Sequence, residues 1–214
     1  MSGTLPTIVL IHGACHTPAN YQTFVDSLKA TGFSSERAEA GKRILMVMHS
    51  YGGMVGRDAL TDELFRSTRA STGRSGGVIH LLYLSAYILQ PGTTVIDIAK
   101  ASGFFPFWPQ FVSNIDNGSC FPIDPTAMFL GDAKFSDVEA ALPHLVRSPL
   151  SAFIALSEGE CWKTLPVTYV RTSNNGSVPP RYQEIMIERA EEEGVVILKM
   201  DYNTCYNSRE NNSL

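Results

Sequence analysis

The chain has few of the residues from which metal centres and disulfide frameworks are built. Its 214 residues include five histidines and only four cysteines, at positions 15, 120, 161 and 205. The cysteines lie far apart and form no C-x-x-C pair, which argues against both a metal site and a set of disulfides. The simplest interpretation is a cytoplasmic protein with free thiols, no metal and no cofactor.

Long apolar runs and an excess of basic charge are also absent. No apolar run reaches the length of a membrane span, and residues 1–6 lack the basic region and cleavage site of a signal peptide. The formal net charge of −4, with mixed signs, offers no positive surface for nucleic acid or an anionic membrane. With 44% hydrophobic residues, we expect a single domain over residues 1–214 with a substantial core.

Residues 44–56 carry the most informative pattern of the chain. An apolar run rich in strand-forming residues ends at Ser50, and Gly52 and a second glycine follow before a helix-like segment. This layout is typical of a nucleophile elbow, a strained strand-to-helix turn that exposes a serine hydroxyl at the sheet edge. The G-x-S-x-G pattern is half present, because Met48 occupies the first glycine position. The alternative is an ordinary strand, turn and helix with an incidental serine.

A second strand-like run ends in a loop suited to binding an oxyanion. Residues 7–11 are apolar, and a His-Gly-Ala-Cys loop follows at 12–15. Acyl transfer needs backbone N–H groups that point at developing negative charge, and small residues leave such groups accessible. We predict one donor from Ala14 or Cys15, and the second from Tyr51, the residue after the serine.

These motifs resemble the α/β-hydrolase superfamily, in particular its branch of esterase-like enzymes, plant hydroxynitrile lyases and methylesterases. The resemblance is most specific at residues 11–16 and 49–53 and spans nearly the whole chain. It implies an α/β fold, in which a parallel sheet of about five strands has helices on both faces. It also implies that Ser50 is the nucleophile of a hydrolase acting on a small-molecule ester or thioester, such as a hydrophobic secondary metabolite.

Periodicity places the remaining elements. Helices are expected at about 19–31, 52–65 and 181–193, and strands at 78–87, 166–170 and 195–201. Strands that alternate with helices predict a parallel sheet.

The segment between the first helix and the elbow strand is unusually short. Family members place a further strand and helix there, so one strand–helix pair is expected to be missing between residues 32 and 43. The strand at 7–11 would then form a sheet edge. Because connections between parallel strands are nearly always right-handed, the first helix must change face or its connection must be left-handed. A missing exon or an incorrect gene model would also explain the short segment.

A cap insert is expected at about 92–160, with an aromatic centre that includes Phe104, Phe107 and Trp108. By analogy with the family, it would form an apolar lid over the active-site mouth. The alternative is that these rings only pack. His12 is expected to be a core histidine that braces the oxyanion loop beside this pocket.

The resemblance fails at two catalytic positions. A serine needs a base to accept its proton and a carboxylate to hold that base. The family's acid falls on Asn175, which cannot stabilise an imidazolium by charge, and its histidine falls on Thr204. No histidine follows His144, which could approach the serine only if the lid folds over it. His80 lies inside a predicted strand, over about 10 Å from the elbow.

Three hypotheses follow from this mixture of features. The first is a serine hydrolase of a small hydrophobic ester or thioester. The second is a catalytically inactive binding protein that keeps the pocket and lid, since fold does not fix function. The third is a truncated relic. Nothing in the sequence sets the oligomeric state.

Overall fold

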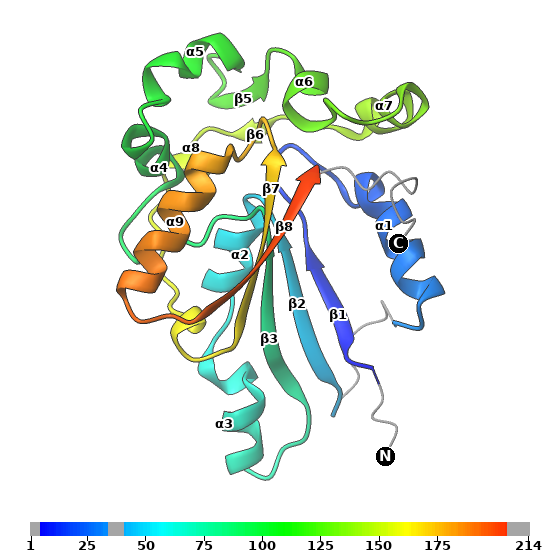
Figure 1. Ribbon diagram of the computed structural model, residues 1–214, viewed down its shortest axis with the longest axis vertical. Coiled ribbons are helices and arrows are strands. Elements are labelled where there is room, and N and C mark those ends of the chain that lie inside the picture. Colours follow the sequence, from blue (N-terminus) through cyan, green and yellow to red (C-terminus); the bar gives the residue numbers. More distant parts are fainter. Residues whose placement is uncertain (1–4, 34–40, 205–214) are drawn as a thin grey trace.

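The computed structural model describes residues 5–33 and 41–204. Its centre is a parallel sheet of five strands in the order β1-β2-β3-β7-β8 (Figure 1). These strands are β1 (Thr7–Ile11), β2 (Arg43–His49), β3 (Gly77–Leu84), β7 (Val167–Asn174) and β8 (Ile197–Thr204). The runs of β1, β2 and β3 are rich in Val, Ile and Leu, as is usual for strands inside an α/β sheet. The predicted α/β class with about five parallel strands is confirmed.

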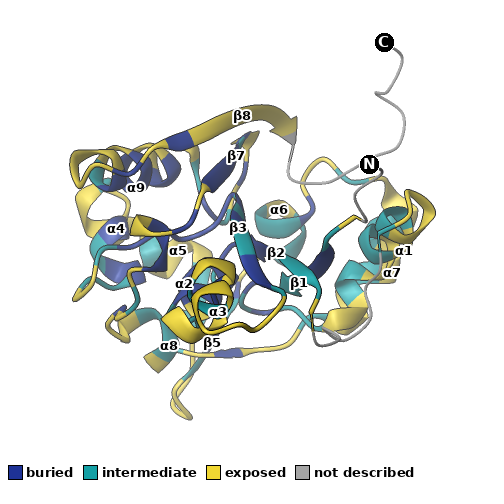
Figure 2. Ribbon diagram, turned by 90° about the horizontal axis from the view of Figure 1, so that it is seen from below, coloured by how far each residue is buried: buried dark blue, intermediate teal, exposed yellow. Residues whose placement is uncertain are grey.

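Helices cover the two faces of the sheet unequally. The helices of the sheet layer are α1 (Gln22–Ala30), α2 (Gly52–Asp58), α3 (Arg66–Ser71) and α9 (Pro180–Glu192). Figure 2, which looks along the strands, shows α2, α3 and α9 on one side and α1 on the other. Helices therefore lie on both faces, but α1 contributes no fully buried residue.

The first two connections of the sheet have opposite hands. The steps from β1 to β2 and from β2 to β3 run in the same direction along the sheet, yet α1 and α2 lie on opposite faces. One of the two connections must therefore be the rare left-handed form. That is one of the outcomes expected from the short segment at 32–42, of which residues 34–40 fall outside the described residues. As predicted, β1 is a sheet edge.

Several predicted element ends are wrong. The strands β7 and β8 continue to Asn174 and Thr204, beyond the predicted ends at 170 and 201. The helix after the elbow ends at Asp58 and not near residue 65, because Thr61 is extended and starts a separate 3₁₀ turn. This break lets Phe65 reach the core, where it is 1% exposed. The third strand ends at Leu84 and not at 87, because Ser85 adopts a positive φ of 43° and turns the chain.

Short elements at 95–154 lie over the carboxyl ends of the strands (Figure 1), and we call them the cap. Its helices are α4 (Val95–Ala101), α5 (Trp108–Phe111), α6 (Pro125–Phe129), α7 (Phe135–Ala141) and α8 (Ser151–Ile154). Its strands β4 (Val112–Asn114), β5 (Ser119–Pro122) and β6 (Ser148–Pro149) form an antiparallel sheet, which the sequence pattern did not predict. Five 3₁₀ turns complete the described chain: Pro18–Tyr21, Asp62–Leu64, Phe105–Phe107, Leu142–His144 and Cys161–Lys163.

The main core lies between the sheet and the helices α2 and α9. Its largest fully buried side chains include Trp162, Tyr83, Tyr169 and Met48. Burial of such a side chain contributes about 1.5–3 kcal/mol, so this layer holds the strand ends rigidly beneath the cap. Across residues 5–33 and 41–204, no helix is both long and apolar enough to cross a membrane.

Candidate functional site

Ser50 lies on a strained turn between β2 and α2. Its φ is 51°, a left-handed conformation that is uncommon for a residue with a side chain. The following glycines permit the turn to pack closely: a Cβ on Gly52 would clash with the carbonyl oxygen of Ile11, and one on Gly53 would lie 2.5 Å from that of Tyr87. The geometry is that of an elbow, with the serine only 8% exposed.

Met48 occupies the position at which the full G-x-S-x-G pattern has glycine. It fits there because the strand β2 and the helix α2 come closest at a glycine further along the helix. Met48 is fully buried, and its sulfur lies 2.8 Å from where a Cβ on Gly56 would be. The glycine that makes room for strand and helix is therefore Gly56. The half-present pattern is thus compatible with a tight turn at Ser50.

The loop at 12–15 packs against this serine. A Cβ on Gly13 would lie 3.4 Å from the Ser50 Oγ. Cys15, with a φ of 61°, donates its N–H to the Ser148 Oγ in the cap at 2.8 Å, so this predicted donor is already occupied. The N–H groups of Ala14 and Tyr51 donate no hydrogen bond to the described part of the chain. These two amides are the free donors beside the serine.

A cavity of about 190 Å³ separates the elbow from the cap. Its floor contains Ser50, Ala14, Cys15 and Tyr51, and most of its remaining lining is apolar. Rings from the cap and nearby loops form the walls, namely Phe104, Trp108, Phe111, Phe121, Phe129 and Phe153. The Ser50 hydroxyl has no hydrogen-bonding partner among the described residues, so it is free to meet a ligand in this cavity.

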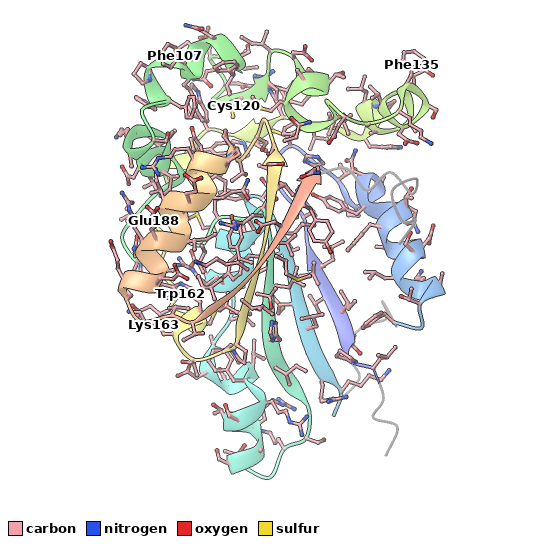
Figure 3. The ribbon with its side chains drawn as sticks, in the orientation of Figure 1. Phe107, Cys120, Phe135, Trp162, Lys163 and Glu188 are labelled. Carbon is pink, nitrogen blue, oxygen red and sulfur yellow. The ribbon has the colours of Figure 1, made fainter. Side chains whose placement is uncertain are left out.

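Two predicted pocket residues lie elsewhere. Phe107 is 47% exposed and projects from the outer side of the cap (Figure 3). His12 is exposed and not a core residue, and it does not line the cavity. Its Nδ1 lies 2.9 Å from the Gly13 carbonyl oxygen, so it contacts the loop from the solvent side.

The side chain of Asn175 forms hydrogen bonds that stabilise the loop after β7. Its Oδ1 accepts the N–H groups of Ser177 at 3.0 Å and Val178 at 2.7 Å, and its Nδ2 donates to the Thr172 Oγ1 at 3.1 Å. The backbone of Thr204 pairs with that of Asn174 at the ends of β8 and β7. The positions of the family's acid and histidine are therefore side by side, but neither carries a titratable side chain.

Neither His80 nor His144 is placed to act as the missing base. His80 donates to or accepts from the Thr168 Oγ1 at 2.8 Å and lies opposite Leu45, five residues before Ser50, which is about 16 Å along a strand. His144 is exposed and does not line the cavity. The Ser50 hydroxyl is consequently hydrogen-bonded to no base among the described residues, and the imidazole of the preceding His49 contacts the Tyr21 hydroxyl instead. The residues described also hold no cluster of His, Cys, Asp or Glu suited to a metal ion.

A hydrogen-bonded link behind the serine was not anticipated. The Tyr21 hydroxyl shares a hydrogen bond with the His49 Nδ1 at 2.6 Å and accepts the Gly13 N–H at 3.1 Å. It thereby joins the 12–15 loop to the residue before Ser50. Helical periodicity placed Tyr21 on an apolar face, which indicated packing but gave no sign of a polar link.

The two histidines at this link are held neutral. Burial, with a smaller contribution from His16 and His12, lowers the pKa of His49 to about 3. Burial also lowers the pKa of His16, whose Nδ1 donates to the Ala14 carbonyl at 2.7 Å. The site therefore presents a hydroxyl and two amides in largely apolar surroundings, and neither of these histidines adds a positive charge near pH 7.

Comparison with known proteins identifies one matching family and several solved structures with a similar fold. The model of the Alpha/beta hydrolase family matches residues 22–201, while no curated protein sequence matches. A pyrethroid hydrolase from Sphingobium faniae superimposes with a TM-score of 0.66 at 19% identity, covering 92% of this chain and 88% of that one. The methylesterase MES16 from Arabidopsis gives 0.62 at 16%, covering 92% and 89%. Polyneuridine aldehyde esterase gives 0.61 at 13%, covering 92% and 90%.

Proposed function

Because this chain belongs to the alpha/beta hydrolase family, we propose that it binds small hydrophobic esters or thioesters and cleaves them slowly through Ser50. The observation that carries the proposal is the presentation of Ser50. A strained φ of 51° persists at this residue, and such strain is retained where it serves a function. The hydroxyl it presents is unpartnered and opens into an apolar cavity.

The amides beside the serine define how an ester would bind. The substrate carbonyl oxygen would accept the N–H groups of Ala14 and Tyr51, and its apolar parts would lie against the rings of the cap. Ser50 Oγ would then form a bond to the carbonyl carbon, and the alcohol or thiol would leave with the serine proton. Water would release the acid from the acyl-enzyme. The names of the fold relatives, two esterases and a pyrethroid hydrolase, support esters as the substrate class.

The rate should be low because no base accepts the serine proton. Oxyanion donors and binding alone leave roughly 10³–10⁴-fold acceleration over water when a triad member is lost. Asn175 and Thr204 occupy the positions of the acid and the base, so we expect turnover several powers of ten below that of a complete triad.

The experiment is labelling with a fluorophosphonate probe, combined with hydrolysis of short p-nitrophenyl esters. We expect slow labelling of Ser50, located by peptide mass spectrometry, and slow ester hydrolysis. Both signals should vanish in Ser50→Ala and persist in the matched control Ser71→Ala, which alters an exposed serine on α3. Labelling or hydrolysis that survives Ser50→Ala would refute the proposal.

A second candidate is ligand binding without turnover, which the hydrogen bonds of Asn175 favour. That side chain has two bonds within its own loop and one to Thr172 of β7, and is not available to orient a base. Under this alternative, a non-hydrolysable hydrophobic ester analogue would raise the melting temperature while Ser50 stayed unlabelled. The two measurements together distinguish a slow enzyme from a binding protein.

A further inference from the structure

The strand β8 ends the sheet with an open edge. It pairs in parallel with β7 on one side, and within the described residues no strand pairs with its other side. Figure 2 shows β8 at the margin of the sheet, with most of its length exposed. An open edge carries a row of unpaired backbone N–H and C=O groups, which can pair with another strand.

The side chains of β8 make this edge unusually apolar on one face. Leu198, Met200 and Tyr202 are 62%, 41% and 54% exposed, and alternate residues of a strand share a face. This face is the one turned away from α9, because Lys199 lies on the opposite face, where it pairs with Glu191 of that helix at 2.8 Å. Native edge strands are usually protected by charges or proline, and here the exposed face has neither.

The charged residues of β8 favour one particular partner, which is β8 itself. Lys199 and Asp201 flank Met200 on the α9 side of the strand. If two β8 strands pair antiparallel about a twofold axis at Met200, Lys199 of each copy lies opposite Asp201 of the other. Opposite charges at directly opposed positions stabilise such a pair, and like charges destabilise it.

Neighbouring registers lack this match. A shift of the twofold axis to residue 199 sets two lysines against each other, and a shift to residue 201 sets two aspartates against each other. In the Met200 register, Leu198 lies opposite Tyr202 of the second copy, so the apolar face also pairs with itself. Both faces of the strand therefore select the same alignment.

We propose that two copies of this chain form a symmetric dimer through antiparallel pairing of their β8 strands, centred on Met200. A twofold interface of this kind uses the same patch on both copies. Contacts between opposed side chains, Leu198 with Tyr202 of the second copy and Met200 with its own counterpart, would add to the pairing of the strand backbones. This inference is independent of the chemistry at Ser50.

Disulfide trapping tests the register directly. The background variant is Cys205→Ser, which removes the native thiol that directly follows β8. Met200→Cys places the two thiols at the twofold axis, within the Cα separation of about 7 Å that a disulfide allows. Leu198→Cys is the matched control on the same exposed face, but its two copies would lie about 13 Å apart. Mild oxidation should convert most of Met200→Cys into a covalent dimer and leave Leu198→Cys monomeric. Equal trapping of both variants, or trapping of neither, would overturn the proposal.

Mass measurement in solution tests the dimer without oxidation. By sedimentation velocity at tens of micromolar, the wild type should be dimeric. Met200→Lys places two lysines opposite each other at the twofold axis, and it should raise the dissociation constant of the dimer at least tenfold. Ile154→Lys, at an apolar position in the cap that is more exposed than Met200 (60% against 41%), should leave it unchanged. A wild type that is monomeric at these concentrations, or equal loss in both variants, would show that β8 is not the interface.

Discussion

The N-terminal and C-terminal halves of the candidate site differ in which features of a hydrolase site they share. The N-terminal half, formed by the 12–15 loop and the Ser50 turn, keeps the strained backbone and close contacts of an acyl-transfer site. The C-terminal half keeps the strands β7 and β8 but has Asn175 and Thr204 where the family resemblance predicts the acid and the histidine. The difference shows that scaffold and chemistry are separable, because the strands are needed for the core and the acid and base only for the reaction.

The difference is also visible in how each half uses its polar groups. Ser50 and the amides of Ala14 and Tyr51 are unpartnered in the described structure, which is unfavourable unless a ligand binds. Asn175, in contrast, satisfies two backbone amides and contacts Thr172. The described structure therefore leaves polar groups of the first half available to a ligand, whereas the Asn175 side chain is used within its own chain segment.

Restoring the C-terminal half should give the largest effect. Combining Asn175→Asp with Thr204→His returns the base and its charged partner, and an aspartate can still accept the amides of Ser177 and Val178. We expect kcat/KM for short p-nitrophenyl esters to rise by about 10³-fold, or about 4 kcal/mol of barrier.

The single variants serve as controls for this gain. Thr204→His alone should gain less, because Asn175 cannot stabilise an imidazolium by charge, and Asn175→Asp alone should gain nothing. Adding Ser50→Ala to the double variant should abolish the gain. A folded double variant with the wild-type rate would show that this half has lost its geometry as well as its side chains.

Much of the fold could be predicted from local patterns, and the failures share one cause. Apolar runs at 7–11 and 44–49 are strands in the structure because run length and flanking glycines are properties of the segment itself. The end of α2 at Asp58 and the antiparallel sheet of the cap depend on contacts between distant segments. The same holds for the link from Tyr21 to His49, since its members are 28 residues apart. Family resemblance located the elbow but could not predict which ring of the cap faces inward.

Replacing one glycine by alanine in each half should show that the N-terminal half is more closely packed, because the added methyl group destabilises the fold more there. In Gly52→Ala the new Cβ would meet the backbone carbonyls of Ile11 and His12, the latter at 2.7 Å, and neither can move freely. In Gly176→Ala it would lie 3.1 Å from the carbonyl oxygens of Ala127 and Met128, where a small shift suffices. We expect free energies of unfolding lowered by about 3 and about 1 kcal/mol, respectively. Urea denaturation measures both, and equal losses would contradict the comparison.

The neutral histidine beside Ser50 should make the N-terminal half sensitive to acid. The pKa of His49 is about 3 in the folded protein and about 6.5 in the unfolded chain. The unfolded state therefore binds more protons below pH 6.5, and stability is lost as the pH falls from there towards 3. The loss from this group is at most about 1.4 kcal/mol per pH unit, and His16 acts in the same direction.

Urea denaturation between pH 7 and pH 5 measures this slope. His49→Asn keeps an acceptor near the Tyr21 hydroxyl but cannot be protonated in this range, so it should flatten the dependence. Asn175→Asp, a change in the other half, should leave the slope from His49 in place. An unchanged slope in His49→Asn would assign the acid sensitivity to other groups.

The smallest effect is expected from removing the Tyr21 hydroxyl, which links two parts of the N-terminal half by hydrogen bonds. Tyr21→Phe removes the hydroxyl that joins the Gly13 N–H to His49 and keeps the ring that packs near His16. The loss of one hydrogen-bonding link should lower the free energy of unfolding by about 1 kcal/mol. Because the 12–15 loop is then less firmly held against the elbow, fluorophosphonate labelling of Ser50 should slow by about tenfold. A merely structural role would lower stability and leave the labelling rate of the folded protein unchanged, so the two readouts separate packing from positioning.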